Sequence, residues 1–171
     1  MIRTEEIQDY SQVEQLLKSA FKSEAEPRLV ERIRSSVIFI PELSIVSETD
    51  GHITGHIMLS IAEVIDDDQS YRVACLAPLA VEPTLQRKGI GGALIREALN
   101  RCQQFNIPLV FLIGHPSYYP QFGFVKAGHY GFQLKQFEVP EEVFMVYEIE
   151  AGALNRLKGE FRYSDAFLDL E

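Results

Sequence analysis

Residues 79–93 of the 171-residue chain read LAVEPTLQRKGIGGA, an apolar strand followed by a glycine-rich turn and the start of a helix. The glycines let the backbone turn tightly and approach a ligand without obstruction by a Cβ atom. The helix that follows presents unpaired N–H groups and the positive end of its dipole. A turn of this kind binds anions, and pyrophosphate is the simplest candidate. The alternative is a glycine-rich helix start that serves packing alone.

Neither of the two common nucleotide-binding fingerprints fits this turn. A Walker A loop has Lys-Ser or Lys-Thr after its last glycine, where this chain has Ala93 and Leu94. The Rossmann fingerprint needs a third glycine three residues after the second, and that position is also Leu94. A nucleotide-binding domain of either type is therefore disfavoured.

The elements on both sides of the turn predict a β-helix-β unit over residues 71–113. Residues 71–81 and 109–113 favour strands, and the helix between them is expected from about Ile90 to Phe105. This connection predicts two parallel strands. Pro78 lies inside the first of them and cannot donate a ladder hydrogen bond, so it marks a bulge or a strand that has parted from its neighbour. The apolar face of the helix is Leu94, Ile95, Ala98, Leu99 and Cys102.

The first half of the chain predicts two helices and then an antiparallel meander. Apolar residues recur every three or four positions over 7–21, with Thr4 as the N-cap, and Pro27 ends this helix or begins a short second one. Asp50-Gly51 is a hairpin turn signal between two strand-like runs. Residues 132–137 and 144–149 predict a last antiparallel pair. The early strands are expected at about 43–46 and 52–64.

Length and composition fit one α+β domain spanning residues 1–171. Hydrophobic residues make up 46% and charged residues 24%, as in ordinary globular proteins. The core is expected over about 1–150, with the apolar segment 151–171 packed on it. Cys75 and Cys102 have no CxxC spacing and are expected to be reduced core thiols in a cytoplasmic protein. A signal peptide is not expected, because the N-terminus carries four acids and no apolar h-region. A membrane span is not expected either, because no apolar run approaches about 18 residues.

The charge balance favours a cationic substrate. The 16 Lys and Arg against 25 Asp and Glu give a formal net charge of −9, which disfavours nucleic acid and attracts amines at long range. A metal site is not expected either. The four histidines show no zinc spacing with the cysteines, and Asp66-Asp67-Asp68 is expected to be a solvated turn.

Two motifs resemble the GNAT acetyltransferase superfamily. Residues 79–91 resemble its acetyl-CoA signature, in which an apolar strand and a turn precede Arg/Gln-x-x-Gly-x-Gly/Ala at a helix start. Residues 119–124, YPQFGF, are similar to the family's Tyr-x-x-x-Gly-Phe segment after the next strand. Both motifs occur in the family's order, and the resemblance runs over most of the chain. Residues 115–120 and 139–146 are similar to the branch known only as predicted acetyltransferases.

The resemblance implies a GNAT-like acyl-CoA N-acyltransferase fold, a mixed α/β architecture with a central mixed sheet. Its fourth and fifth strands splay apart and leave a slot for the pantetheine arm of acetyl-CoA, the implied co-substrate. Backbone groups of residues 79–81 would pair with the pantetheine amides, and residues 86–92 would bind the diphosphate. The implied contacts are Leu79, Ala80, Val81, Gln86, Arg87, Lys88, Gly89, Ile90, Gly91 and Gly92.

The implied reaction transfers an acetyl group to a primary amine of a small molecule or peptide, by direct attack in a ternary complex. A backbone N–H near Leu79 would stabilise the oxyanion. Tyr119 stands where the family places the proton donor for the leaving thiolate. Tyr118 is the competing donor, and packing against Phe122 is the structural alternative for Tyr119.

The general base departs from the family pattern. Some members carry a Glu on the fourth strand where this chain has Cys75, and a neutral thiol is a poor base. The remaining candidates are Glu63, His56 and His115. His115 has the best position because it follows the fifth strand close to Tyr119. A chain of water molecules leading to solvent is the other route for the proton.

Two alternative functions stay open at this level. The chain could be an acyl-CoA-binding regulator that has lost its chemistry, or an enzyme for another acyl donor or acceptor. The acceptor pocket in this family is built from the first two helices and the last strands, and its sequence does not identify the amine. A homodimer is kept as an alternative to a monomer.

Overall fold

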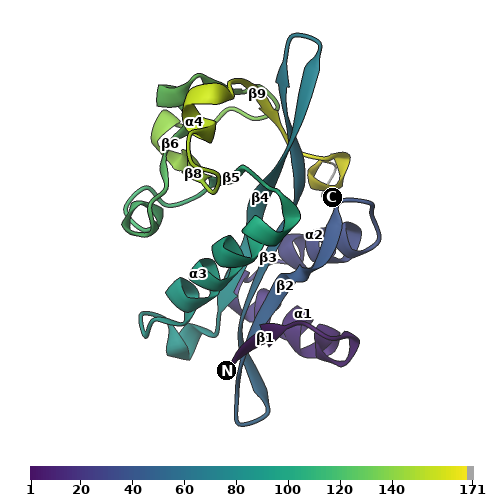
Figure 1. The fold of residues 1–171 in the computed structure, drawn as a ribbon. Coiled ribbons are helices and arrows are strands. Elements are labelled where there is room, and N and C mark those ends of the chain that lie inside the picture. The colour runs from purple at the N-terminus through teal and green to yellow at the C-terminus, as the bar shows by residue number, and fades with distance from the viewer. Residues whose placement is uncertain (169–171) are drawn as a thin grey trace.

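The structure, a computed structural model, describes residues 1–168 (Figure 1). The helices are α1 (Tyr10–Phe21), α2 (Ala25–Arg34), α3 (Ile90–Cys102) and the short α4 (Ala153–Arg156). The strands are β1 (Ile2–Thr4), β2 (Phe39–Thr49), β3 (His52–Asp66), β4 (Gln69–Val81), β5 (Leu109–Ile113), β6 (Val125–Lys126), β7 (Phe132–Leu134), β8 (Phe144–Glu148) and β9 (Gly159–Arg162). Within these residues, no helix has the length and apolar character that a membrane span requires.

The described strands form one mixed sheet. Its main path is β1-β2-β3-β4-β5-β8-β6, and β9 adds to β3 and pairs with β7. The pairs are antiparallel except for β4 with β5 and β7 with β9. The predicted α+β class is confirmed, and the β4-α3-β5 connection is the parallel crossover expected from residues 71–113.

Helices cover both faces of the sheet. Side chains of α1 and α2 pack with Met58, Val73 and Cys75 on one face. Side chains of α3 pack with Leu59 and Ala74 on the other. Because neighbouring residues along a strand point to opposite faces, α1 and α2 lie across the sheet from α3. The predicted buried face of α3 is found as expected.

Strands β4 and β5 part soon after they meet. Their pairing is limited to Ala74 with Val110 and Cys75 with Phe111, although both strands continue beyond these residues. On its other side, β4 shifts register against β3 next to Pro78, so the predicted bulge is present. The sheet therefore has the predicted gap between its fourth and fifth strands.

The predicted antiparallel pair of residues 132–137 and 144–149 is wrong. Strand β8 instead pairs with β5 and β6, and β7 pairs in parallel with β9. Strands β7 and β9 have only three and four residues, too few for an alternating pattern to indicate a partner. Their pairing depends on long-range packing that a local pattern does not contain.

The start of the first helix also differs from the expectation. The α-helix begins at Tyr10, after a 3-10 turn over Ile7–Asp9, and Thr4 lies in β1 instead of capping a helix. Ile7 is 78% exposed, so it does not belong to the buried face. Asp9 accepts a hydrogen bond from the Glu6 N–H at 2.8 Å, which stabilises this turn.

The C-terminal segment packs against the sheet through its apolar side chains. Phe161 in β9 is fully buried, and its ring stacks on Phe111 in β5 at 4.4 Å between centroids. The other buried apolar side chains of this segment are Ala153, Leu157, Tyr163 and Phe167. Residues 169–171 of the predicted segment lie outside the described residues.

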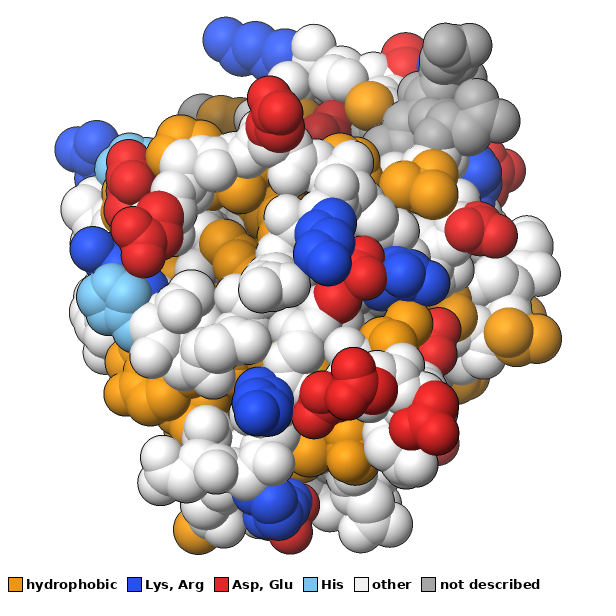
Figure 2. Space-filling model, turned by 90° about the horizontal axis from the view of Figure 1, so that it is seen from above, with side chains coloured by type: hydrophobic (Ala, Val, Ile, Leu, Met, Phe, Trp, Pro, Cys, Tyr) orange, Lys and Arg blue, Asp and Glu red, His pale blue; other side chains and the backbone are white. Residues whose placement is uncertain are grey.

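Charged side chains are interspersed on the face seen in Figure 2. Lys and Arg side chains lie singly or in pairs, next to Asp and Glu side chains. Among the described residues on this face, they form no continuous basic stripe. A stripe of that kind is the surface that tracks a nucleic-acid backbone.

Candidate active site

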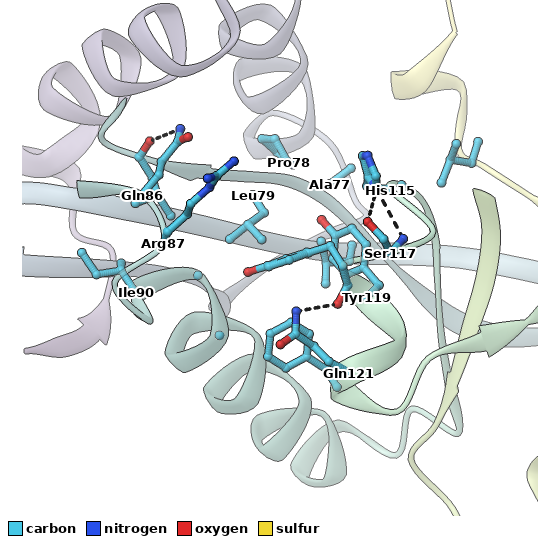
Figure 3. A pocket seen from close by; sticks show the side chains of 18 of the residues that line it. Ala77, Pro78, Leu79, Gln86, Arg87, Ile90, His115, Ser117, Tyr119 and Gln121 are labelled. Atoms are coloured by element: carbon cyan, nitrogen blue, oxygen red, sulfur yellow. Dashed lines mark hydrogen bonds between the residues drawn. The ribbon is translucent and has the colours of Figure 1, made fainter. Parts of the chain in front are cut away.

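A cavity of about 1110 Å³ opens where β4 and β5 part. It is lined by residues 76–79 and 81 of β4, the turn before α3, the first turns of α3 and residues of the segment between Ile113 and Phe122. In Figure 3, Gln86 and Arg87 lie at one end of this cavity and His115, Ser117 and Tyr119 at the other. The gap between the strands thus joins the glycine-rich turn to the segment that carries Tyr119.

Most of the predicted site residues come together here. Ala80 and Lys88 are the exceptions: Ala80 is buried opposite His56 in the β3–β4 ladder, and Lys88 is exposed outside the cavity. The predicted residues that line the cavity are Leu79, Val81, Gln86, Arg87, Gly89, Ile90, Gly91, Gly92, His115 and Tyr119.

The turn before α3 directs backbone N–H groups toward the cavity. Gly89 has a φ of +90°, which glycine adopts at little cost, and the first hydrogen bond of α3 runs from the Ala93 N–H to the Gly89 carbonyl at 3.0 Å. The amides of residues 90–92 precede this bond and have no acceptor within the helix. Arg87 and Arg96 also line this end, which is therefore suited to an anion.

The two adjacent tyrosines lie in different surroundings. A Cβ atom at Gly91 would lie 2.6 Å from the Tyr118 hydroxyl, so Tyr118 reaches the start of α3. A Cβ at Gly114 would lie 2.5 Å from the ring of Tyr119, which instead packs at the end of β5. The ring of Tyr119 contacts Tyr118 and Phe124, at 5.0 and 5.7 Å between centroids. Phe122, the expected packing partner, lies against Tyr118 at 5.2 Å.

Burial and the neighbouring Tyr118 raise the pKa of Tyr119 to about 12. The phenol therefore keeps its proton at neutral pH. Within residues 1–168 its hydroxyl has no hydrogen-bond partner, although the side chain lines the cavity. Tyr119 is thus a protonated group whose hydroxyl is available to a ligand.

His115 lines the cavity but is held by its own turn. Its Nδ1 accepts a hydrogen bond from the Ser117 N–H at 3.3 Å and lies 2.8 Å from the Ser117 hydroxyl (Figure 3). An Nδ1 that accepts from a backbone N–H carries no proton, so in the neutral ring the proton is on Nε2. If His115 acts as a base, it takes up the proton at Nδ1 and gives up the hydrogen bond that Nδ1 accepts from the Ser117 N–H.

The other candidate bases do not line the cavity. Glu63 is exposed on β3 and accepts a hydrogen bond from Ser70. Cys75 is buried, and burial raises the pKa of its thiol to about 12, so it stays neutral. His56 is buried under α1 and α2, where its Nε2 lies 3.0 Å from the Ser44 hydroxyl, which donates to Glu5 at 2.8 Å.

The buried imidazole of His56 predicts a pH-dependent stability. Burial, and then the nearby Arg34, lower its pKa to about 3, while the unfolded chain titrates near 6.5. Below pH 6.5 the unfolded chain therefore binds a proton that the folded chain does not. We expect this group to lower the free energy of unfolding by about 2 kcal/mol between pH 7 and pH 5.

Urea unfolding of the wild type and the His56→Gln variant at both pH values measures this contribution. Glutamine keeps a polar group near Ser44 but does not titrate, so the variant should lose less stability than the wild type on acidification. Equal losses in the two proteins would contradict a neutral, buried His56.

The described part of the chain was searched for side chains that could bind a metal ion. Within residues 1–168, no group of three His, Cys, Asp or Glu residues is placed to hold a metal ion. The triple acid falls at the β3–β4 hairpin, with Asp67 in the left-handed conformation at a φ of +54°. This hairpin turn does not line the cavity.

The helices contribute cavity-lining residues that were not predicted. Among them are Phe21 at the end of α1, Glu26 and Leu29 in α2, and Arg96 in α3. Their local patterns are ordinary, because an acid in the first turn of a helix is common and apolar residues at helical spacing usually belong to the core. Only the tertiary arrangement brings them to the gap between β4 and β5.

Comparison with known proteins agrees with this geometry. The family described as "Acetyltransferase (GNAT) domain" matches residues 1–127. The uncharacterized N-acetyltransferase YjhQ of Escherichia coli K12 is 32% identical over 161 residues, which cover 92% of this chain and 88% of that protein. The uncharacterized N-acetyltransferase YhbS of the same strain is 28% identical over 167 residues, 98% of each chain.

Two solved structures share the fold. The GNAT family N-acetyltransferase YhbS from Escherichia coli, in complex with CoA, superposes with a TM-score of 0.90 at 28% identity and covers 98% of this chain and 91% of that one. A GNAT family acetyltransferase from Brucella melitensis, in complex with acetyl-CoA, has a TM-score of 0.79 at 27% identity and covers 98% and 97%. The predicted fold and the predicted enzyme class, an acyltransferase, are confirmed by these findings. The chain belongs to the GNAT acetyltransferase family.

Proposed function

We propose that the protein transfers the acetyl group of acetyl-CoA to a primary amine of a small molecule or peptide, within a ternary complex. The observation that carries this proposal is the cavity that runs from the glycine-rich start of α3 through the gap between β4 and β5. Relatives with the same fold were solved with CoA and acetyl-CoA, which supports the choice of donor.

The chain's own residues fit acetyl-CoA. The amides of residues 90–92 and the guanidinium groups of Arg87 and Arg96 provide donors and positive charge for the diphosphate. Beyond Cys75, one edge of β4 has no strand partner among residues 1–168, so backbone groups of residues 79–81 can pair with the pantetheine amides. Gln86 donates a hydrogen bond to the Val81 carbonyl at 3.2 Å and connects the turn to this edge.

In the proposed reaction, the amine attacks the thioester carbonyl, an oxyanion forms, and the thiolate leaves. Holding the two substrates in attack geometry contributes up to about 7–11 kcal/mol in ideal cases. A backbone N–H near Leu79 stabilises the oxyanion, and Tyr119 donates its proton to the leaving thiolate. We assign the amine proton to His115, the one base candidate from the sequence analysis that lines the cavity, or to water.

A thiol-release assay with acetyl-CoA and a broad panel of primary amines tests this function. The panel includes amino acids, short lysine peptides, alkylamines and diamines. Amine-dependent release of CoA, with an acetylated amine as the second product, supports the proposal. Tight binding of acetyl-CoA in calorimetry with no release across the panel would contradict it and favour a regulator.

A further inference from the structure

The cavity is lined by charged groups of both signs. Arg87, Arg96 and the amides at the start of α3 make the end proposed for the diphosphate positive. Glu26 is the one carboxylate among the described residues that line the cavity, and it belongs to α2. A cavity lined in this way has donors and positive charge for an anionic ligand beside Arg87 and Arg96, and a carboxylate for a cationic group at Glu26.

Glu26 has no partner that explains its position. Its Oε1 atom is buried and accepts no hydrogen bond within residues 1–168, and the carboxylate forms no ion pair with any described residue. A buried carboxylate oxygen without a donor costs free energy, because water solvates it in the unfolded chain. The other acids near it differ, since Glu24 lies 3.7 Å from Lys18 and Glu31 is exposed.

The cavity passes from one face of the sheet to the other. Arg96 projects from α3, whereas Glu26 and Leu29 project from α2, which covers the opposite face. The faint purple helices of Figure 3 lie across β4 from α3, on the Pro78 side. An acceptor can therefore reach the strand gap from the α2 side while acetyl-CoA occupies the α3 side.

Apolar side chains flank Glu26 at this entrance. Leu29 is buried and lines the cavity one turn further along α2. Phe21 is 38% exposed although it is a large apolar side chain, and it lines the same entrance from the end of α1. Together they form a surface for an apolar stem, with a carboxylate beside it.

We propose that Glu26 binds a second positive charge on the acceptor, at the far end from the amine that is acetylated. This inference rests on the proposed function. The reaction takes place at the strand gap near Leu79 and Tyr119, whereas Glu26 lies in the helical layer outside the sheet. The acceptor class is then a primary amine joined by an apolar stem to a second cation, as in linear diamines. The net charge of −9 attracts the same class.

Matched amines test this assignment in the thiol-release assay. The diamines putrescine and cadaverine are compared with butylamine and pentylamine, which have the same stems without the second charge. We expect Glu26→Gln to raise KM for the diamines and lower kcat/KM about tenfold, the loss expected when a charge-assisted hydrogen bond becomes neutral. The kcat/KM for the monoamines should change less than about twofold.

Glu31→Gln is the control, because it removes an exposed acid from the same helix outside the cavity and should leave both amine classes unchanged. Calorimetry with acetyl-CoA checks that each variant is folded and binds the donor. Equal use of diamines and monoamines by the wild type would overturn the inference. So would an equal loss for both classes in Glu26→Gln, since it would place the carboxylate at the reacting amine. No release from the wild type with any amine contradicts the proposed function itself.

Discussion

Gly91→Asp is expected to weaken acetyl-CoA binding about a hundredfold or more. Residue 91 lies in the first turn of α3 and lines the cavity, so a carboxylate there would face the diphosphate. Placing like charges together across an interface costs several kcal/mol. An acid in the first turn also complements the helix dipole, so the fold should be retained. Isothermal titration calorimetry with acetyl-CoA measures the loss.

The uncharged isostere separates charge from size. A Cβ atom at residue 91 would come within 2.6 Å of the Tyr118 hydroxyl, so any side chain there displaces this hydroxyl. Gly91→Asn shares this displacement without the charge, and we expect it to bind acetyl-CoA about tenfold more tightly than Gly91→Asp. Wild-type affinity in Gly91→Asp would exclude the start of α3 as the diphosphate site.

Tyr119→Phe is expected to lower kcat at least about tenfold with little change in acetyl-CoA affinity. The variant keeps the ring, and with it the contacts to Tyr118 and Phe124, and removes only the hydroxyl. Without the phenol, the thiolate leaves unprotonated or waits for water. Because burial raises the pKa of Tyr119 to about 12, this group should not limit the rate between pH 7 and pH 10. Steady-state kinetics over this range measure both effects.

Tyr118→Phe distinguishes between the two phenols. The Tyr118 hydroxyl lies at the start of α3, whereas the ring of Tyr119 packs at the end of β5, so we expect only Tyr119 to reach the sulfur. A large fall of kcat in Tyr118→Phe, together with normal turnover in Tyr119→Phe, would transfer the role to Tyr118. Normal turnover in both variants would leave proton donation to water.

The sequence predicted those parts of the fold that have a local signal. Helix α3 has apolar residues at helical spacing, the β2–β3 hairpin has Asp50-Gly51, and Pro78 has no N–H to donate to the ladder. These features act within a few residues, so they can be found without knowledge of the tertiary structure. Strands β7 and β9 are too short to show periodicity, and their pairing brings together residues distant in the chain.

The candidate site likewise contains residues that a local motif predicts and residues that only the tertiary structure brings in. Residues 86–92 and Tyr119 belong to continuous motifs and were predicted from them. Glu26 and Phe21 lie in helices whose patterns are unremarkable, and they join the cavity because α1 and α2 cover the sheet across from α3. The donor side of the site is thus encoded locally, whereas the acceptor side depends on how two helices pack.

A crystal structure of the protein with coenzyme A tests the central claim most directly. It should show diphosphate oxygens within hydrogen-bond distance of the amides of residues 90–92, and the sulfur in the gap between β4 and β5 beside the Tyr119 hydroxyl. Coenzyme A bound at another surface, or with its diphosphate away from the start of α3, would contradict the account.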